Sequence, residues 1–297
     1  MLLLLASVSP GREVLVSRGE LVEIGGSFRV PDIIQQGGAK LREVGTTNRT
    51  RASDFLEAAG RRTGAILSVH QSNFQIVGFT EAASVAELAD VARRKRIPLL
   101  IDEGSGRVVD LAAYGLKSEP TIAELLSSGA DAVTCSTDKL IGSLQGGLIL
   151  GKREIIEKCA RHPLMRALRA GKESYALLGR TLLSFLQGKH EREIPLYRMM
   201  ATPLEDLRGR ANAIVAGSSM SIVESRSAVG GGTTPSETIA SISVSIEGDA
   251  SSHARLLRTR ERPIIGRIID EHFTLDLRAI DPGDDAYVRQ SLGVAVR

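Results

Sequence analysis

An acidic residue and a lysine, each placed after an apolar run, are the residues of this chain best suited to chemistry. Asp102 follows the run 99–101, and Lys139 follows the segment 132–136. Such an acid can keep a pyridine nitrogen protonated, and a lysine amine can bind an aldehyde as a Schiff base. Lysine suits this role because its amine loses a proton more readily away from water. An acid followed by a lysine in this order predicts a pyridoxal phosphate site.

Three polar residues near these two extend the predicted cofactor site. His70 ends another apolar run, and it is a candidate for stacking on the cofactor ring because the chain has no Trp. Asn73 could donate to the phenolic oxygen of that ring, and Ser136 stands just before Lys139. The alternatives are ordinary ones, namely a histidine satisfied within a turn, an aspartate that caps a loop, and a lysine in solvent.

Two arginines form a candidate anion site. Arg166 and Arg169 are three positions apart, so on a helix they would share a face and could clamp one anion. The alternative is a basic helix face exposed to solvent.

Predicted strands and helices alternate along the first two thirds of the chain. We expect strands at 13–17, 40–44, 65–70, 99–102, 132–136 and 147–150, and helices from 31, over 80–95, over 121–128 and over 171–186. This alternation predicts an α/β fold with a mostly parallel sheet, whose ligands bind beyond the carboxyl ends of the strands. Beyond residue 195, strands at 220–224 and 239–246, a helix at 253–260 and a hairpin at 264–277 predict a small α+β domain. The expected domains are therefore 1–194 and 195–297.

Composition sets further limits. Hydrophobic residues make up 42% and charged residues 25% of the chain, with a formal net charge of +3, which are the values of an ordinary globular protein with a mildly basic balance. The two cysteines indicate a reducing compartment, so we expect a cytoplasmic protein. The apolar start, 1–6, is too short for a membrane span and has no basic flank, which predicts the tail of a core helix. We expect no membrane association and no metal.

Long, uncommon strings in this chain resemble the bacterial selenocysteine synthase family, L-seryl-tRNA(Sec) selenium transferase. The resemblance runs nearly end to end and is carried by Gly11–Val14, Ser17–Gly26, Arg29–Asp32, Glu43–Thr50, Ser72–Phe74, Gly104–Gly106, Asp138–Leu140, His162–Arg169, Pro263–Arg267 and Leu275–Arg278.

The resemblance implies a pyridoxal phosphate-dependent transferase of fold type I, with an aspartate aminotransferase-like large domain and a small carboxyl-terminal domain. It implies that Lys139 is the Schiff-base lysine, that Asp138 lies near the substrate, and that Arg166 and Arg169 bind the anionic group of the selenium donor. The implied reaction converts seryl-tRNA(Sec) to selenocysteinyl-tRNA(Sec) with selenophosphate through an aminoacrylyl intermediate. The family also forms ring-like homo-oligomers.

The chain departs from the family pattern at its start and beside Lys139. Family members carry a further amino-terminal region that binds tRNA, and Gly142–Gln145 differs from the commoner Gly-Gly-Pro-Gln. We therefore expect a chain that lacks an amino-terminal region and by itself binds the cofactor weakly. The alternatives are a pyridoxal phosphate lyase or aldolase-like relative that acts on a free amino acid, and a non-catalytic fragment.

Overall fold

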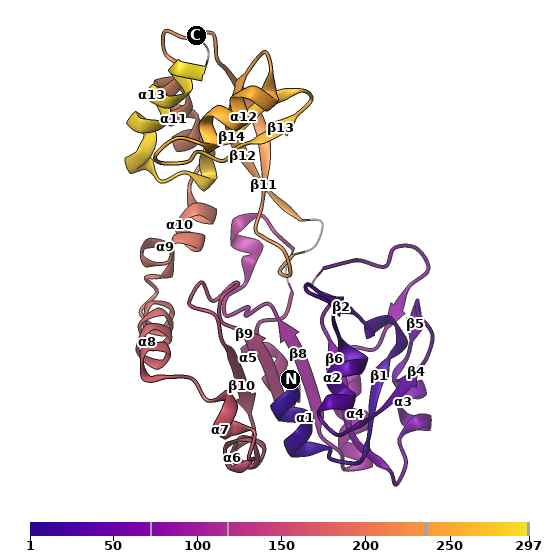
Figure 1. Cartoon of the computed structure of the whole chain (residues 1–297). Helices are drawn as coiled ribbons and strands as arrows, with labels where there is room; N and C mark the ends of the chain where they lie inside the picture. The colour runs from indigo at the N-terminus through magenta and orange to yellow at the C-terminus, as the bar shows by residue number, and fades with distance from the viewer. Residues whose placement is uncertain (72, 118, 235–236, 296–297) are drawn as a thin grey trace. The chain divides into compact units, whose positions relative to one another are not determined.

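The computed structural model describes residues 1–71, 73–117, 119–234 and 237–295 (Figure 1). Ser72, the first residue of the string Ser72–Phe74, lies outside these ranges. The chain forms two compact units. The first contains Met1–Ala112, Lys117–Lys189 and Gly230–Ser236, and the second contains Ala113–Leu116, His190–Val229 and Glu237–Arg297. The segment that begins at Gly230 thus returns to the first unit from the second half of the chain.

The first unit is built on a six-stranded sheet with the order β10-β9-β8-β6-β1-β4. The strands are β1 (Glu13–Ser17), β4 (Lys40–Val44), β6 (Thr63–Val69), β8 (Leu99–Gly104), β9 (Ala132–Ser136) and β10 (Gly147–Gly151). All neighbours pair in parallel except β10, which runs antiparallel to β9. The predicted, mostly parallel sheet is confirmed.

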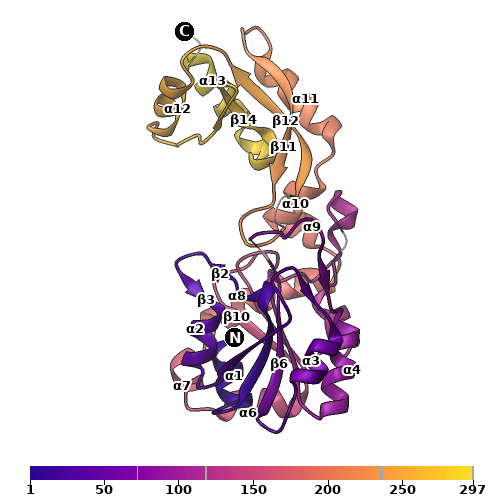
Figure 2. The ribbon, with the colours of Figure 1, turned by 90° about the vertical axis from the view of Figure 1, so that its right-hand side faces the viewer.

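Helices cover both faces of this sheet, as Figure 2 shows. One face packs against α3 (Ala52–Ala58), α4 (Val85–Lys95), α5 (Ile122–Ser127) and α8 (Lys172–Leu186). The other face packs against α1 (Leu2–Val8), α2 (Val30–Gln36) and α6 (Arg153–Arg161), with the short helix α7 (Met165–Leu168) after α6. Buried aliphatic side chains from successive strand positions point to alternate faces, so each strand contributes to both cores. Two small pairings complete the unit: β2 (Glu23–Ile24) with β3 (Phe28–Arg29), and β5 (Arg49–Thr50) with β7 (Glu81–Ala82).

The predicted start of the helix at residue 80 is wrong. Glu81 and Ala82 form β7, and α4 begins only at Val85. Ser84 accepts the backbone N–H of Glu87, and the Glu87 carboxylate accepts the backbone N–H of Ser84. This capping box fixes the helix start because it satisfies amide groups that the first turn leaves unpaired.

The second unit has an antiparallel sheet with the order β11-β12-β14-β13. Its strands are β11 (Ser221–Ala228), β12 (Thr238–Ile246), β13 (Arg267–Ile269) and β14 (His272–Asp276), and its helices are α9 (His190–Glu193), α10 (Pro195–Ala201), α11 (Leu204–Val215), α12 (Ala250–Arg258) and α13 (Asp285–Ala295). A separate apolar core joins this sheet to α11, α12 and α13. The predicted small α+β domain is confirmed. In the ranges described, no helix is long and apolar enough to cross a membrane.

Candidate active site

The structure brings His70 and Asp102 together at the carboxyl ends of neighbouring parallel strands. Val69 of β6 is in register with Asp102 of β8, and the backbone N–H of His70 donates to the Asp102 carbonyl oxygen at 3.0 Å. The strand β8 runs two residues beyond Asp102 to Gly104, so the acid does not end the strand as predicted. Its pairing with β9 is irregular between Asp102 and Gly104. Polar groups therefore gather at the sheet edge where parallel sheets bind ligands.

The carboxylate of Asp102 is held by a hydroxyl from the next strand. Thr134 Oγ1 donates to Asp102 Oδ1 at 2.5 Å, and Thr134 itself is buried. Burial, followed by the charges of the Glu103 and Asp102 carboxylates, raises the pKa of the neighbouring Cys135 thiol to about 12, while the charge of Lys139 acts in the opposite direction. The thiol therefore lies within electrostatic reach of both Asp102 and Lys139.

Lys139 lies in the bend after β9, where its amine donates to two neutral oxygens. Nζ is 3.1 Å from the Gly104 carbonyl oxygen and 3.5 Å from Ser136 Oγ. Gly232 lies close against this side chain, since a Cβ atom at that position would lie 3.3 Å from Lys139 Cε. In the described part of the chain Lys139 Nζ forms no ion pair.

His70 has a charged neighbour that the sequence did not indicate. Its Nε2 atom lies 3.1 Å from Glu119 Oε2, and the same oxygen accepts from Arg107 Nη2 at 2.8 Å. Glu119 precedes α5 and Arg107 follows β8, so nothing in the local sequence pattern connects them with His70.

The other predicted site residues are not placed in this group. Asp138 is exposed, and Asn73 is exposed and donates to the Glu23 carbonyl oxygen at 2.8 Å. Arg166 lies on α7, which has only four residues, and Arg169 is its C-cap with an extended backbone (φ −62°, ψ 134°). The expected shared helix face therefore does not extend to Arg169. Both arginines are exposed.

A carboxyl group at the end of β1 was also missed. Glu20 Oε1 accepts from Ser68 Oγ at 2.9 Å, while its Oε2 is buried with no partner among the described residues. Burial raises the pKa of Glu20 to about 7. Its partner Ser68 stands on β6 two residues before His70, so Glu20 lies near the same edge of the sheet.

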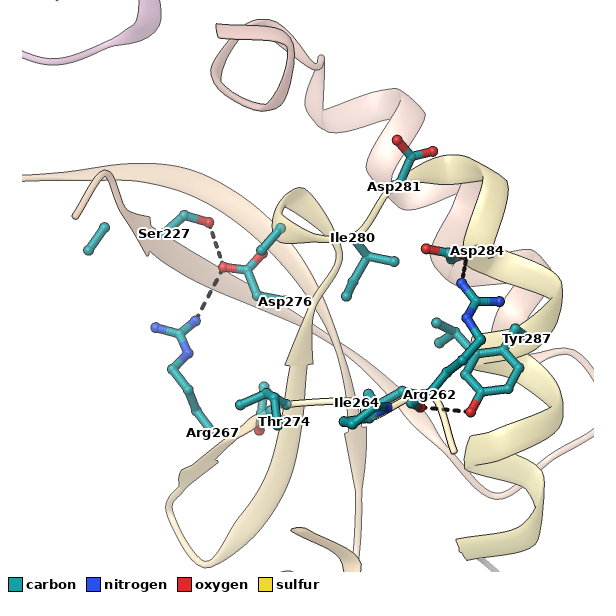
Figure 3. A pocket seen from close by; sticks show the side chains of 16 residues that line it. Ser227, Arg262, Ile264, Arg267, Thr274, Asp276, Ile280, Asp281, Asp284 and Tyr287 are labelled. Atoms are coloured by element: carbon teal, nitrogen blue, oxygen red, sulfur yellow. Dashed lines mark hydrogen bonds and ion pairs between the residues drawn. The ribbon is translucent and has the colours of Figure 1, made fainter. Parts of the chain in front are cut away.

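The second unit contains a cavity of about 560 Å³ (Figure 3). Its charged side chains are all paired: Arg262 contacts Asp284 and stacks on Tyr287, Arg267 contacts Asp276, and Asp281 contacts Arg198 outside the cavity. None of the residues grouped around Lys139 lines it. The chemistry therefore points to the sheet edge of the first unit as the candidate active site.

Residues 1–281 match the family model described as L-seryl-tRNA selenium transferase. A protein named L-seryl-tRNA(Sec) selenium transferase from Carboxydothermus hydrogenoformans is 41% identical over 302 residues, which cover 98% of this chain and 65% of the relative. A protein of the same name from Clostridium perfringens is 44% identical over 291 residues, covering 94% of this chain and 63% of the relative. The chain thus spans about 65% of the length of such curated relatives.

Among solved structures, D-glucosaminate-6-phosphate ammonia-lyase superposes with a TM-score of 0.70 at 22% identity, covering 99% of this chain and 78% of that one. At this identity the likeness shows the fold alone. Together with the observed sheet, it confirms the predicted α/β fold with a small second domain.

Proposed function

The chain belongs to the L-seryl-tRNA selenium transferase family, and from this membership we propose that it carries the cofactor site of such an enzyme. The proposed reaction converts seryl-tRNA(Sec) to selenocysteinyl-tRNA(Sec) with selenophosphate as selenium donor. The observation that carries the proposal is the gathering of Asp102, Lys139 and His70 at one edge of the sheet in a chain of this family.

The donor set at this edge fits pyridoxal phosphate. Asp102 is an acid held by Thr134, and it suits a protonated ring nitrogen. Lys139 Nζ contacts only carbonyl and hydroxyl oxygens, so its conversion to a free amine breaks no ion pair with the described residues. Bound there, the cofactor would supply an electron sink for negative charge at the α-carbon of serine.

The residues of the chain would then perform separate tasks. Lys139 would bind the cofactor aldehyde, and its amine, which forms no ion pair with the described residues, is suited to move the α-proton. His70 and Ser136 would border the ring, and Asn73 would reach it only after leaving the Glu23 carbonyl oxygen. Asp138, Arg166 and Arg169 are exposed and would contact substrate, with the two guanidinium groups toward the anionic donor.

Borohydride trapping tests this proposal. Protein incubated with pyridoxal phosphate should bind it with an absorbance near that of an imine, and reduction should leave the adduct on Lys139, as peptide mapping would show. Lys139→Ala should lose both signals. An adduct on a different lysine would show that the site is assigned wrongly.

A second measurement separates the proposed substrate from the alternative of a free amino acid. Joined to the amino-terminal region that family members carry, the chain should release water from the serine of seryl-tRNA(Sec) and incorporate selenium from selenophosphate, and it should leave free serine unchanged. Turnover of free serine without any reaction of seryl-tRNA(Sec) would favour a lyase.

A further inference from the structure

Glu119 connects a buried arginine to the histidine of the candidate site. Its Oε2 atom accepts from Arg107 Nη2 at 2.8 Å and lies 3.1 Å from His70 Nε2. The three residues come from different parts of the first unit, namely the segment before α5, the loop after β8 and the end of β6. Such a chain of contacts can fix a side chain that has no close neighbours in sequence to hold it.

Arg107 is the anchored end of this series of contacts. Its side chain is only 1% exposed, and its backbone is held at both sides, since its N–H donates to Glu103 Oε1 at 3.4 Å and its carbonyl oxygen accepts from Ile122 at 3.0 Å. A buried guanidinium requires a nearby anion, and Glu119 supplies it. The hydrogen bond from His70, and then the charge of Arg107, hold the pKa of Glu119 below its usual range. The ion pair with the buried Arg107 guanidinium at 2.8 Å by itself keeps Glu119 ionised and holds it in place as an acceptor.

The ionised carboxylate decides which nitrogen of His70 carries a hydrogen. A carboxylate oxygen only accepts, so Nε2 must donate. Nδ1 is buried and has no partner among the described residues, and an N–H group there would be left unsatisfied. The contacts therefore favour the tautomer with hydrogen on Nε2 and a lone pair on Nδ1. The backbone N–H of His70 is fixed as well, by the Asp102 carbonyl oxygen at 3.0 Å.

We propose that Glu119 and Arg107 are positioning residues that fix the orientation and the Nε2–H tautomer of His70 beside Asp102. His70 then presents one ring face to the cofactor ring without having to be ordered when the cofactor binds. This role rests on the proposed function only in naming pyridoxal phosphate as the group that His70 borders. The orientation and tautomer belong to the chain itself.

A double-mutant cycle separates positioning through His70 from a general structural role. The variants are Glu119→Gln, His70→Ala and the double variant, and the readouts are the dissociation constant for pyridoxal phosphate and the circular dichroism of its bound absorbance band. Glu119→Gln should weaken binding by about tenfold, as expected for loss of a charged hydrogen bond, and should change the circular dichroism. In the His70→Ala background the same substitution should have no further effect. Additive losses, or an unchanged Glu119→Gln variant, would overturn the proposal.

Glu81→Gln is the matched control. Glu81 also lies between two arginines, Arg49 at 3.5 Å and Arg51 at 3.0 Å, but it contacts none of the site residues. This variant should bind the cofactor as the unsubstituted protein does. An equal loss in the control would mean that charge neutralisation anywhere in the unit has the same result, and the proposal would fail.

A measurement without substitution covers the case in which Glu119→Gln does not fold. In the cofactor-free protein, the ¹⁵N chemical shifts of the His70 ring should show hydrogen on Nε2 and a bare Nδ1. Hydrogen on Nδ1 with a bare Nε2 would overturn the positioning role whatever the cofactor. Failure of Lys139 to take up pyridoxal phosphate would instead refute the proposed function and leave the tautomer result standing.

Discussion

Replacing Gly232 by Ala tests whether the returning segment controls Lys139. Gly232 has a φ of +75°, a conformation that costs a side-chain-bearing residue about 1–2 kcal/mol. The added methyl group would also lie 3.3 Å from Lys139 Cε and 3.6 Å from Nζ. Because that is tighter than ordinary van der Waals contact, the flexible lysine must move by a few tenths of an ångström.

This movement should cost cofactor binding in addition to stability. Lys139 Nζ now sits 3.1 Å from the Gly104 carbonyl oxygen, and displacement would move the amine away from the position fixed by this contact, from which it would meet the cofactor aldehyde. A misplacement of about 1 Å can cost a positioned reacting group about 100-fold, so a shift of a few tenths of an ångström corresponds to about tenfold. We therefore expect Gly232→Ala to weaken pyridoxal phosphate binding by about tenfold, measured by absorbance titration, and to slow trapping by borohydride.

Gly217→Ala supplies the matched control. Gly217 has nearly the same φ, +77°, but no atom lies within 4 Å of the position of an added Cβ. Both variants should lose about 1 kcal/mol of stability in denaturant unfolding, and only Gly232→Ala should lose cofactor affinity. Equal cofactor affinity in the two variants would refute the inference that Gly232 restrains Lys139.

Other predictions concern single residues of the first unit. The pKa of Glu20 is raised from 4.5 to about 7, so the folded protein has a stability contribution below pH 4.5 that is lost as the pH rises through 7. The unsubstituted protein should therefore lose roughly 3 kcal/mol of unfolding free energy between about pH 5 and pH 8 in denaturant unfolding, and Glu20→Gln should not show this loss. An identical pH dependence in both proteins would contradict this. Asp102→Asn should retain the cofactor at Lys139 but lose most turnover, because the amide cannot keep the ring nitrogen protonated; unchanged turnover would show that Asp102 is only structural. Arg166→Ala and Arg169→Ala should each raise the KM for selenophosphate about tenfold with little change for seryl-tRNA(Sec). Arg161→Ala, at another exposed arginine, should have no effect, and equal losses for both substrates would indicate another role.

Much of the fold could be predicted because it depends on local pattern. The strands at 13–17, 40–44 and 132–136 have the bounds expected from their apolar runs. The start of α4 was misplaced because Thr80 and Glu81 resemble a helix start, while the capping box at Ser84 and Glu87 decides it. Residues suited to a helix start stand at both Thr80 and Ser84. Only the pairing of Glu81 on β7 with Arg49 on β5 excludes the start at Thr80.

The candidate site likewise contains some residues that the sequence indicated and others that only the structure revealed. Asp102 and Lys139 could be found from sequence because their types and their places after apolar runs are unusual for ordinary surface residues. Arg107, Glu119 and Gly232 could not be found, because no local pattern connects them with the site: Glu119 meets His70 49 positions away in sequence, and Arg107 reaches His70 only through Glu119. Such contacts depend on where the carboxyl ends of parallel strands and the loops after them meet, and on the return of the segment at Gly230 to the first unit. Sequence periodicity determines the elements, whereas packing of the whole unit decides which loops become neighbours, because burial of the two sheet faces sets the strand order.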